Sequence, residues 1–281
     1  MSYQNYKAIQ VTVEGAAMWV TIAHPPLNVL DAVMMPELND LAGRLAVDEE
    51  IQVVVFQSGD PDFFIVHGDM NFVNKPDTFV ELRLGNPGTE HLNPMMRLHE
   101  RLRELPQITI GKLAGFARGG GAELLSALDM RFAAIGKAGL AQMEALVGII
   151  PGAGGTVYLP QLVGRARALE IVAGAALFNA EEAERYGWVN RALPAEQLDD
   201  FVDGLAHRIA GRAAGVARAA KRAVQAGAPA LGDALTISNH LLYSTFGAPK
   251  APELAIAALS LGAQTREGEI ELEKLLSKLP R

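Results

Sequence analysis

Residues 117–124 read Ala-Arg-Gly-Gly-Gly-Ala-Glu-Leu, and the patterns on either side of them determine the expected fold. A strand-like apolar run covers 108–114, a helix-like pattern follows at 122–128, and another strand-like run covers 130–135. Parallel strands joined by crossing helices are the economical architecture for this alternation. The stretch therefore predicts an α/β protein.

The same alternation extends toward the N-terminus. Alternating or short apolar runs predict strands at 9–13, 18–23 and 53–56. Apolar residues at steps of three and four predict a helix over 34–45. The segment 71–94 is rich in proline and glycine, and we expect a partly helical excursion rather than a sheet element.

Beyond residue 155 the pattern becomes helical. Asn179 and Glu182 have the spacing of a capping box, and Gly187 is suited to end that helix. We expect a short strand at 188–191 and then long helices. These helices are predicted over 196–226 and 251–279.

The predicted organisation is a core over residues 1–195 and a helical C-terminal region over 196–281. An apolar stripe in the last helix is expected to dock on the body of the protein or on another subunit. It consists of Leu272, Leu275, Leu276 and Leu279.

Composition narrows the classes of function. The 281 residues are 49% hydrophobic, and 25 basic against 32 acidic residues leave a net charge of −7. This charge argues against a nucleic-acid duplex or an anionic membrane as the main partner. The absence of cysteine excludes thiolate nucleophiles and cysteine-ligated metals, and the histidines show no ligand-like spacing, so no metal site is predicted. We expect a cytoplasmic protein.

Glycine-rich turns mark the places that could carry chemistry. One is the loop 66–69, Val-His-Gly-Asp, where a tight turn with Asp69 as a cap explains the residues equally well. The second is the triple glycine 119–121, whose following helix directs free N–H groups outward. The third is the run 148–156, Gly-Ile-Ile-Pro-Gly-Ala-Gly-Gly-Thr, which could be only a loop and a helix cap.

Two carboxyl groups lie beside these turns. Glu123 follows the triple glycine and Glu144 precedes the third turn. Paired carboxylates near N–H donors are suited to acid/base chemistry on a polarised carbonyl. Stabilisation of the helix start is the alternative role for Glu123.

Taken together, these motifs resemble those of the crotonase, or enoyl-CoA hydratase/isomerase, superfamily over roughly residues 8–230. The resemblance rests on ordered stretches throughout that range. They are His24-Pro25 with Asn28-Val-Leu30, 53–56, 66–69, 119–123, 148–156, 159–164 and 180–190. It implies a spiral of strand–strand–helix units with a helical C-terminal trimerisation region.

The resemblance also implies a site. The amides of Gly68 and Gly120 are expected to form an oxyanion hole for the thioester oxygen of an acyl-CoA, Glu123 to activate water, and Glu144 to exchange a proton with the α-carbon. Further substrate contacts are expected from seven residues. These are Val66, His67, Asp69, Met70, Gly119, Pro151 and Gly152. The resemblance implies an acyl-CoA substrate, whose acyl pocket the segment 71–94 is expected to line. No further cofactor is expected, and a homotrimer or dimer of trimers is the expected assembly.

Two residues depart from the pattern of the superfamily. His67 replaces a small residue. A packed ring or a contact with CoA is favoured over a catalytic role. Arg118 replaces a more often apolar residue and could reach a phosphate or an acidic neighbour, with a surface salt bridge as the alternative.

Three hypotheses for function follow. Hydration of a 2-enoyl-CoA is favoured because both glutamates and both oxyanion glycines are present. Isomerisation, hydrolysis or decarboxylation of an acyl-CoA is the second, and a non-catalytic acyl-CoA or protein scaffold is the third.

Overall fold

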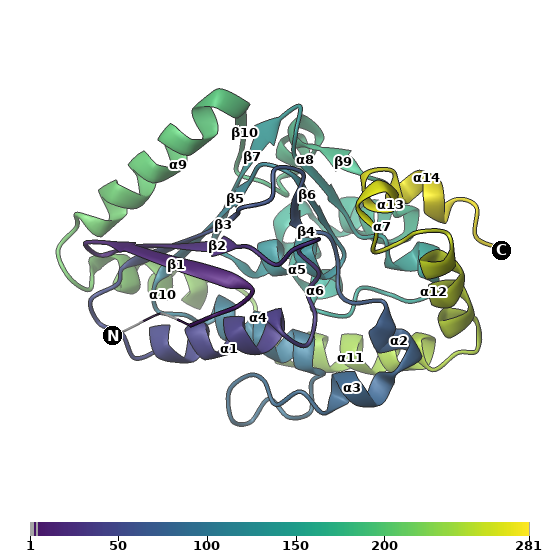
Figure 1. Ribbon diagram of the computed structural model, residues 1–281. Helices are drawn as coiled ribbons and strands as arrows, with labels where there is room; N and C mark the ends of the chain where they lie inside the picture. Colours follow the sequence, from purple (N-terminus) through teal and green to yellow (C-terminus); the bar gives the residue numbers. More distant parts are fainter. Residues whose placement is uncertain (1–2, 4, 281) are drawn as a thin grey trace.

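The computed structural model describes residue 3 and residues 5–280, and it confirms the mixed α/β fold. Within this range the strands form two sheets, ordered β1-β2-β3-β5-β7-β10 and β4-β6-β8-β9. All neighbours pair in parallel except β1 with β2 and β8 with β9. Figure 1 shows the first sheet running through the centre of the molecule. The strands of the first sheet are β1 (Ile9–Glu14), β2 (Ala17–Ile22), β3 (Val53–Ser58), β5 (Ile108–Leu113), β7 (Met130–Ile135) and β10 (Arg191–Pro194).

Successive segments of the chain give one strand to each sheet. β3, β5 and β7 in the first sheet are each followed by a short strand in the second, so the chain winds through strand, strand and helix. The second sheet contains β4 (Phe63–Ile65), β6 (Phe116–Arg118), β8 (Gly139–Ala141) and β9 (Phe178–Asn179). This winding is the reason that turns far apart in sequence meet at one end of the second sheet.

Helices cover both faces of the first sheet. Buried side chains of α1 (Met34–Leu45) join the main core, which apolar residues of both sheets share. On the other face, Leu198, Val202 and Ala206 of α9 (Ala195–Ala210) pack against β2, β3 and β7 (Figure 1). The remaining helices before α9 are α2 (Asn71–Asn74), α3 (Pro76–Val80), α4 (Pro94–Arg103), α5 (Gly120–Ala127), η1 (Glu144–Val147), α6 (Gly155–Val163), α7 (Arg165–Gly174) and α8 (Ala180–Tyr186).

The predicted strand at 188–191 is wrong in position. The capping box of α8 is present and Gly187 ends the helix in a left-handed conformation, as predicted. The Trp188 amide then donates to Ala183 O at 2.8 Å, so it closes the helix end and does not enter a sheet. Strand β10 therefore begins only at Arg191.

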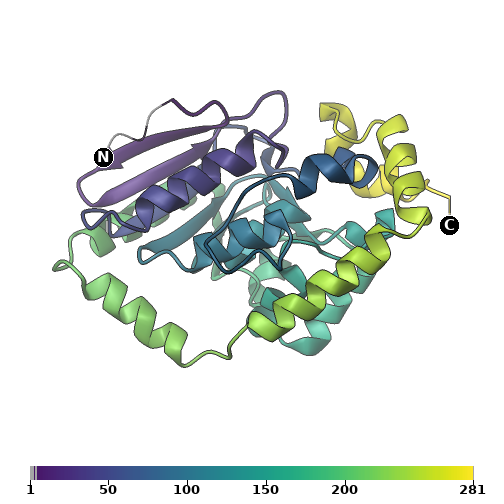
Figure 2. The same cartoon turned by 90° about the horizontal axis from the view of Figure 1, so that it is seen from below.

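The prediction of two long C-terminal helices is also wrong, because the described chain contains several shorter helices there. Left-handed glycines interrupt the helical pattern at Gly215 and Gly262. These helices follow one another along the lower edge of Figure 2 and up its right side. They are α10 (Val216–Ala226), α11 (Gly232–Phe246), α12 (Lys250–Ser260), α13 (Arg266–Ile270) and α14 (Leu272–Leu276).

The apolar stripe of the last helix docks on the body of its own chain. Leu272, Leu275, Leu276 and Leu279 share one buried cluster with residues such as Met70, Met143 and Leu254. Within the described residues, no helix is both long enough and apolar enough to cross a membrane.

Candidate active site

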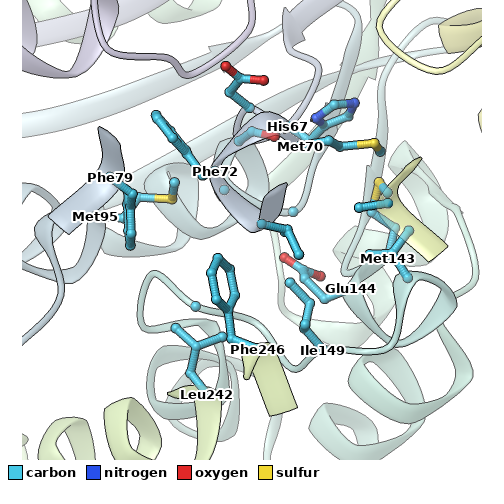
Figure 3. Close-up of a pocket in the computed structure, with 18 of the residues that line it drawn as sticks. His67, Met70, Phe72, Phe79, Met95, Met143, Glu144, Ile149, Leu242 and Phe246 are labelled. Atoms are coloured by element: carbon cyan, nitrogen blue, oxygen red, sulfur yellow. Dashed lines mark hydrogen bonds between the residues drawn. The ribbon is translucent and has the colours of Figure 1, made fainter. Parts of the chain in front are cut away.

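A cavity of about 690 Å³, counting its open mouth, lies where the glycine-rich turns meet (Figure 3). Most of the residues that the sequence predicted for the site line it. These are His67, Gly68, Asp69, Met70, Gly119, Gly120, Glu123, Glu144 and Gly152. Val66 and Pro151 do not line it. Val66 is fully buried in a separate cluster with Leu27 and Phe63, and Pro151 is also buried.

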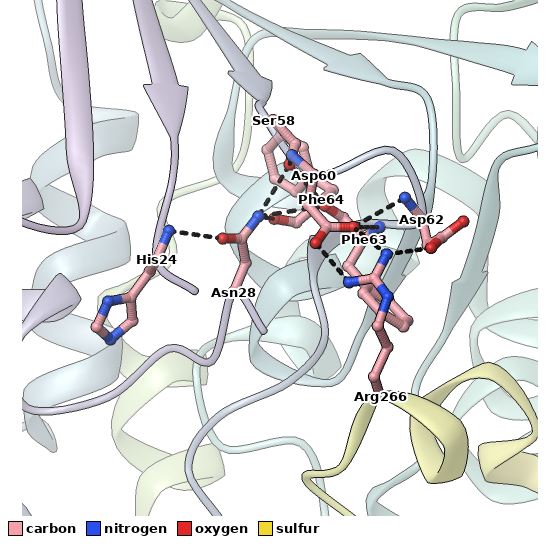
Figure 4. A network of polar contacts seen from close by, with 8 residues as sticks. All are labelled: His24, Asn28, Ser58, Asp60, Asp62, Phe63, Phe64 and Arg266. Carbon is pink, nitrogen blue, oxygen red and sulfur yellow. Dashed lines mark hydrogen bonds and ion pairs between the residues drawn. The ribbon is translucent and has the colours of Figure 1, made fainter. Parts of the chain in front are cut away.

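The backbone around Gly68 is held by the chain at 28–30. Leu30 N donates to His67 O at 2.9 Å, and Asp69 N donates to Leu30 O at 3.1 Å. The Asn28 side chain supports the strand that leads to this loop, because its amide donates to the carbonyls of Phe63 and Phe64 (Figure 4). Strand β4 and the loop after it are therefore held in one position.

The triple glycine brings a second backbone against the first. A Cβ placed on Gly120 would lie 3.4 Å from Gly68 N, so the two predicted amides are neighbours. Gly120 is also the first residue of α5, where N–H groups lack an acceptor within the helix. A Cβ on Gly121 would lie 2.4 Å from Ile65 O, which explains why a side chain is not tolerated between these two elements.

Glu123 is bound by the turn at the start of α6. Its Oε1 accepts from Ala153 N and Gly155 N, each at 2.7 Å, and the residue is only 1% exposed. These contacts join Glu123 to the turn before α6, so stabilisation of the start of α5 does not explain them. A carboxylate bound at the N-terminus of a second helix is held in a fixed orientation.

Helix α4 supports the turn that binds Glu123. Asn93 Nδ2 donates to Gly152 O at 2.7 Å, and His99 Nδ1 lies 3.0 Å from Ala153 O. Burial lowers the pKa of His99 to about 4, so its ring is neutral and Nδ1–H is the donor. The turn that holds Glu123 is thus tied to α4 on its far side.

Glu144 is the first residue of η1 and is also buried. A Cβ on Gly119 would lie 2.9 Å from Glu144 Oε1, so the lack of a side chain at Gly119 leaves room for this carboxyl. Gly119 has φ +45°, a conformation that also favours glycine.

The two carboxyl groups differ in their surroundings. Burial raises the pKa of Glu123 to about 7, although the amides of the α6 turn act in the opposite direction. Burial and the nearby Glu123 charge raise the pKa of Glu144 well above its usual value. Near neutral pH, Glu144 therefore holds a proton while Glu123 ionises, and the pair can supply one acid and one base.

Apolar side chains form the rest of the cavity, and the sequence revealed only part of them. Phe72 and Phe79 come from the segment 71–94, as predicted. Leu242 and Phe246 come from α11, which no local pattern connected to the site (Figure 3). Other apolar lining residues are Met70, Val73, Met95, Met143, Val147, Ile149 and Ala255.

The two departures noted in the sequence lie together. The His67 side chain is buried, and its Nε2 lies 3.0 Å from Glu269 Oε1. In the loop, His67 directly precedes Gly68. Arg118 forms a salt bridge with Glu273 at 2.6 Å, so it reaches an acidic neighbour, but its side chain is fully buried and the pair is not a surface salt bridge. Sequence reasoning missed both acidic partners, because nothing in their local pattern distinguishes them from surface glutamates.

Known proteins resemble this chain in sequence and in fold. A solved Streptomyces avermitilis protein, provisionally assigned as an enoyl-CoA hydratase, is 46% identical, with a TM-score of 0.92 and coverage of 97% of this chain and 98% of that one. The short-chain-enoyl-CoA hydratase of Clostridium acetobutylicum is 29% identical over 76% of this chain and 79% of its own. The crotonyl-CoA hydratase of Syntrophomonas wolfei is 31% identical over 72% of this chain and 74% of its own.

A family comparison covers most of the sequence. Residues 12–253 match the profile of the family described as Enoyl-CoA hydratase/isomerase. The match spans both glycine loops, both buried glutamates and the helices that close the cavity. This chain belongs to the enoyl-CoA hydratase/isomerase family.

Proposed function

We propose that this protein is a lyase that adds water to a 2-enoyl-CoA and forms a 3-hydroxyacyl-CoA. The observation that carries this proposal is one cavity lined by Gly68, Gly120, Glu123 and Glu144. Burial raises the pKa of both acids, and the nearby charge of Glu123 also raises that of Glu144. Relatives named as enoyl-CoA hydratases support it.

In the proposed reaction, the amides of Gly68 and Gly120 bind the thioester oxygen. Ionised Glu123 takes a proton from water as the water oxygen bonds to C3, and the C2=C3 electron pair moves toward the thioester to form an enolate. Protonated Glu144 then gives its proton to C2, and the carbonyl re-forms. Two N–H donors stabilise the developing oxyanion, and loss of one such donor typically costs about 10²–10³ in rate.

The lining of the cavity favours an apolar acyl chain. Aromatic and aliphatic side chains of α2, α3, α4 and α11 surround the space beyond the acids. Because these side chains offer no charged partner to an acyl group, we propose substrates whose acyl chain is a hydrocarbon. Hydration exchanges no electrons with a redox partner, so the proposal requires no cofactor besides the thioester.

The test is incubation with short-, medium- and aryl-chain 2-enoyl-CoA thioesters, monitored by loss of the conjugated enoyl absorbance. We expect turnover in the wild type and a loss of kcat of about 10²–10⁴-fold in Glu144→Gln, because an amide cannot deliver the proton to C2. Full turnover in Glu144→Gln would reject this role. Isomerised, hydrolysed or decarboxylated products without a 3-hydroxyacyl-CoA would reject the hydratase proposal.

We also propose that the chain assembles as a homotrimer or a dimer of trimers. Support comes from apolar side chains left exposed on the C-terminal helices. They include Val216 and Val224 of α10, Ile237 and Leu241 of α11, and Ile256 of α12. Exposed apolar side chains gathered on neighbouring helices are typical of subunit interfaces.

A further inference from the structure

The C-terminal segment 264–273 contacts both loops that carry the proposed oxyanion glycines. It includes α13 and the first residues of α14, which lie close to the cavity but provide none of its lining side chains. Its polar contacts with the body come from Gln264, Arg266, Glu269 and Glu273.

The first of these contacts acts on the residue before Gly68. His67 Nε2 lies 3.0 Å from Glu269 Oε1, and His67 Nδ1 lies 2.7 Å from Gly68 O. A carbonyl and an ionised carboxylate only accept hydrogen bonds, so this geometry suits an imidazolium in which both ring nitrogens donate.

The charges of this pair are consistent with its geometry. The His67 and Glu269 side chains are 4% and 0% exposed. Burial opposes the charge on His67, but the Glu269 carboxylate outweighs burial and raises the pKa of His67. Burial likewise opposes the charge on Glu269, and His67 outweighs it and lowers the pKa of Glu269.

Gln264 connects the same segment to the other side of Gly68. Its backbone N donates to Glu269 Oε1 at 2.8 Å, and its side chain donates to Asp69 Oδ1 at 2.9 Å. The residues immediately before and after Gly68 are therefore both tied to one short stretch of chain.

A second ion pair acts on the loop of the triple glycine. Arg118 lies two residues before Gly120, and its guanidinium donates to both carboxylate oxygens of Glu273, at 2.6 and 3.0 Å. The Arg118 side chain is fully buried, whereas the Glu273 side chain is 26% exposed. A two-bond contact of this kind fixes direction as well as distance.

Together these groups form a balanced cluster of two cations and two anions, in which His67, Arg118 and Glu269 are buried and Glu273 is partly exposed. Removal of one member leaves an uncompensated buried charge, which is costly. Arg266 of the same segment provides a contrast, because it pairs with Asp60 and Asp62 in the turn before β4, away from the glycines (Figure 4).

We propose that Glu269 and Glu273 are positioning residues that act through His67 and Arg118 to hold the Gly68 and Gly120 amides at the spacing that binds a thioester oxygen. This inference rests on the proposed oxyanion hole. Misplacement by about 1 Å of a group that must be aligned with the reacting atoms can cost about 10²-fold in rate. The C-terminal segment is thus expected to affect kcat more than KM.

The experiment compares Glu269→Gln with Glu267→Gln, the same change two residues away at an exposed position of α13. We expect kcat for a 2-enoyl-CoA to fall about 10- to 100-fold in Glu269→Gln, with KM within about twofold of the wild type. Glu267→Gln should match the wild type in both constants.

A second readout needs no turnover. Infrared spectroscopy of bound hexanoyl-CoA, labelled with ¹³C at the thioester carbonyl, reports how strongly the two amides polarise that carbonyl. We expect the downshift of the carbonyl stretch to shrink in Glu269→Gln and to persist in Glu267→Gln. This measurement tests the positioning role even if the wild type does not hydrate any enoyl-CoA.

Wild-type kcat or a wild-type carbonyl frequency in folded Glu269→Gln would overturn the proposal. If Glu269→Gln does not fold, Glu273→Gln decides by the same two readouts, with the exposed Glu271→Gln of the neighbouring turn as its control. Wild-type values in Glu273→Gln would then overturn the proposal, whereas a reduced carbonyl downshift would support it.

Discussion

Glu123 and Glu144 are both buried carboxyl groups, yet only Glu123 is bound by the turn at the start of α6. Glu123 accepts two backbone N–H bonds from the turn before and at the start of α6. Glu144 has no such support from that turn and also faces the charge of Glu123. Hydrogen bonds to the charged form favour ionisation, so the proton belongs on Glu144.

This difference predicts a bell-shaped pH profile for kcat/KM. Activity should rise with pH through about 7 as Glu123 ionises, and fall at alkaline pH when Glu144 loses its proton. The measurement is kcat/KM from about pH 5 to about pH 10. In Glu144→Gln the alkaline fall should disappear, and a flat wild-type profile below pH 7 would contradict the assignment of Glu123 as base.

The sequence showed which residues form the glycine loops, but it did not show why glycine is required at each position. The need for glycine at Gly121 comes from Ile65 O, which belongs to a different strand. The sequence also left several interpretations of His67 open, and the structure places its ring against Glu269. Such contacts depend on packing between distant segments, and local patterns carry no information about them.

Helix α4 illustrates how an element supports the site from behind. Asn93 is its N-cap and accepts from the amides of Met95 and Met96, while its own amide donates to Gly152 O. The residue is 1% exposed, so water cannot replace a lost partner there. One side chain thus joins the start of α4 to the turn that binds Glu123.

We expect Asn93→Ala to lower the free energy of unfolding by about 1–3 kcal/mol, because it removes the cap and leaves a buried carbonyl without its donor. Asn93→Asp keeps the cap acceptor but not the donor to Gly152 O, so its kcat should fall while its α4 remains capped. Urea unfolding and steady-state kinetics check these outcomes. An unfolding free energy of Asn93→Ala equal to that of the wild type would contradict them.

Elements with strong local signals were predicted well. The helix over 34–45 and the capping box at Asn179 are confirmed, because amphipathic spacing and caps act within a few residues. The C-terminal helices were not delimited correctly. Their alanine-rich sequences favour helix, but the left-handed glycines Gly215 and Gly262 interrupt it.

At the scale of the whole molecule, α11 has two different faces. Leu242 and Phe246 line the cavity, whereas Ile237 and Leu241 are 61% and 53% exposed. A subunit packed on the exposed face would therefore hold the helix that closes the acyl pocket. The proposed assembly and the proposed substrate site share this element.

We expect Ile237→Lys to weaken the proposed assembly, because a buried lysine at an interface lacks a partner. Sedimentation should give three or six times the 30.0 kDa chain mass for the wild type and a smaller mass for the variant. Val13→Lys is the control, since Val13 is an exposed apolar residue on β1, away from these helices. A monomeric wild type would contradict the proposed assembly.

By itself, the sequence determined the alternation of strands and helices, the glycine loops, and the identities of the two buried acids. These features arise from local spacing and from residue chemistry. Only the tertiary structure decided that α11 closes the pocket and that Glu269, 202 residues from His67, lies beside it. Contacts over such separations form only when the core places both segments together, so no single stretch of sequence encodes them.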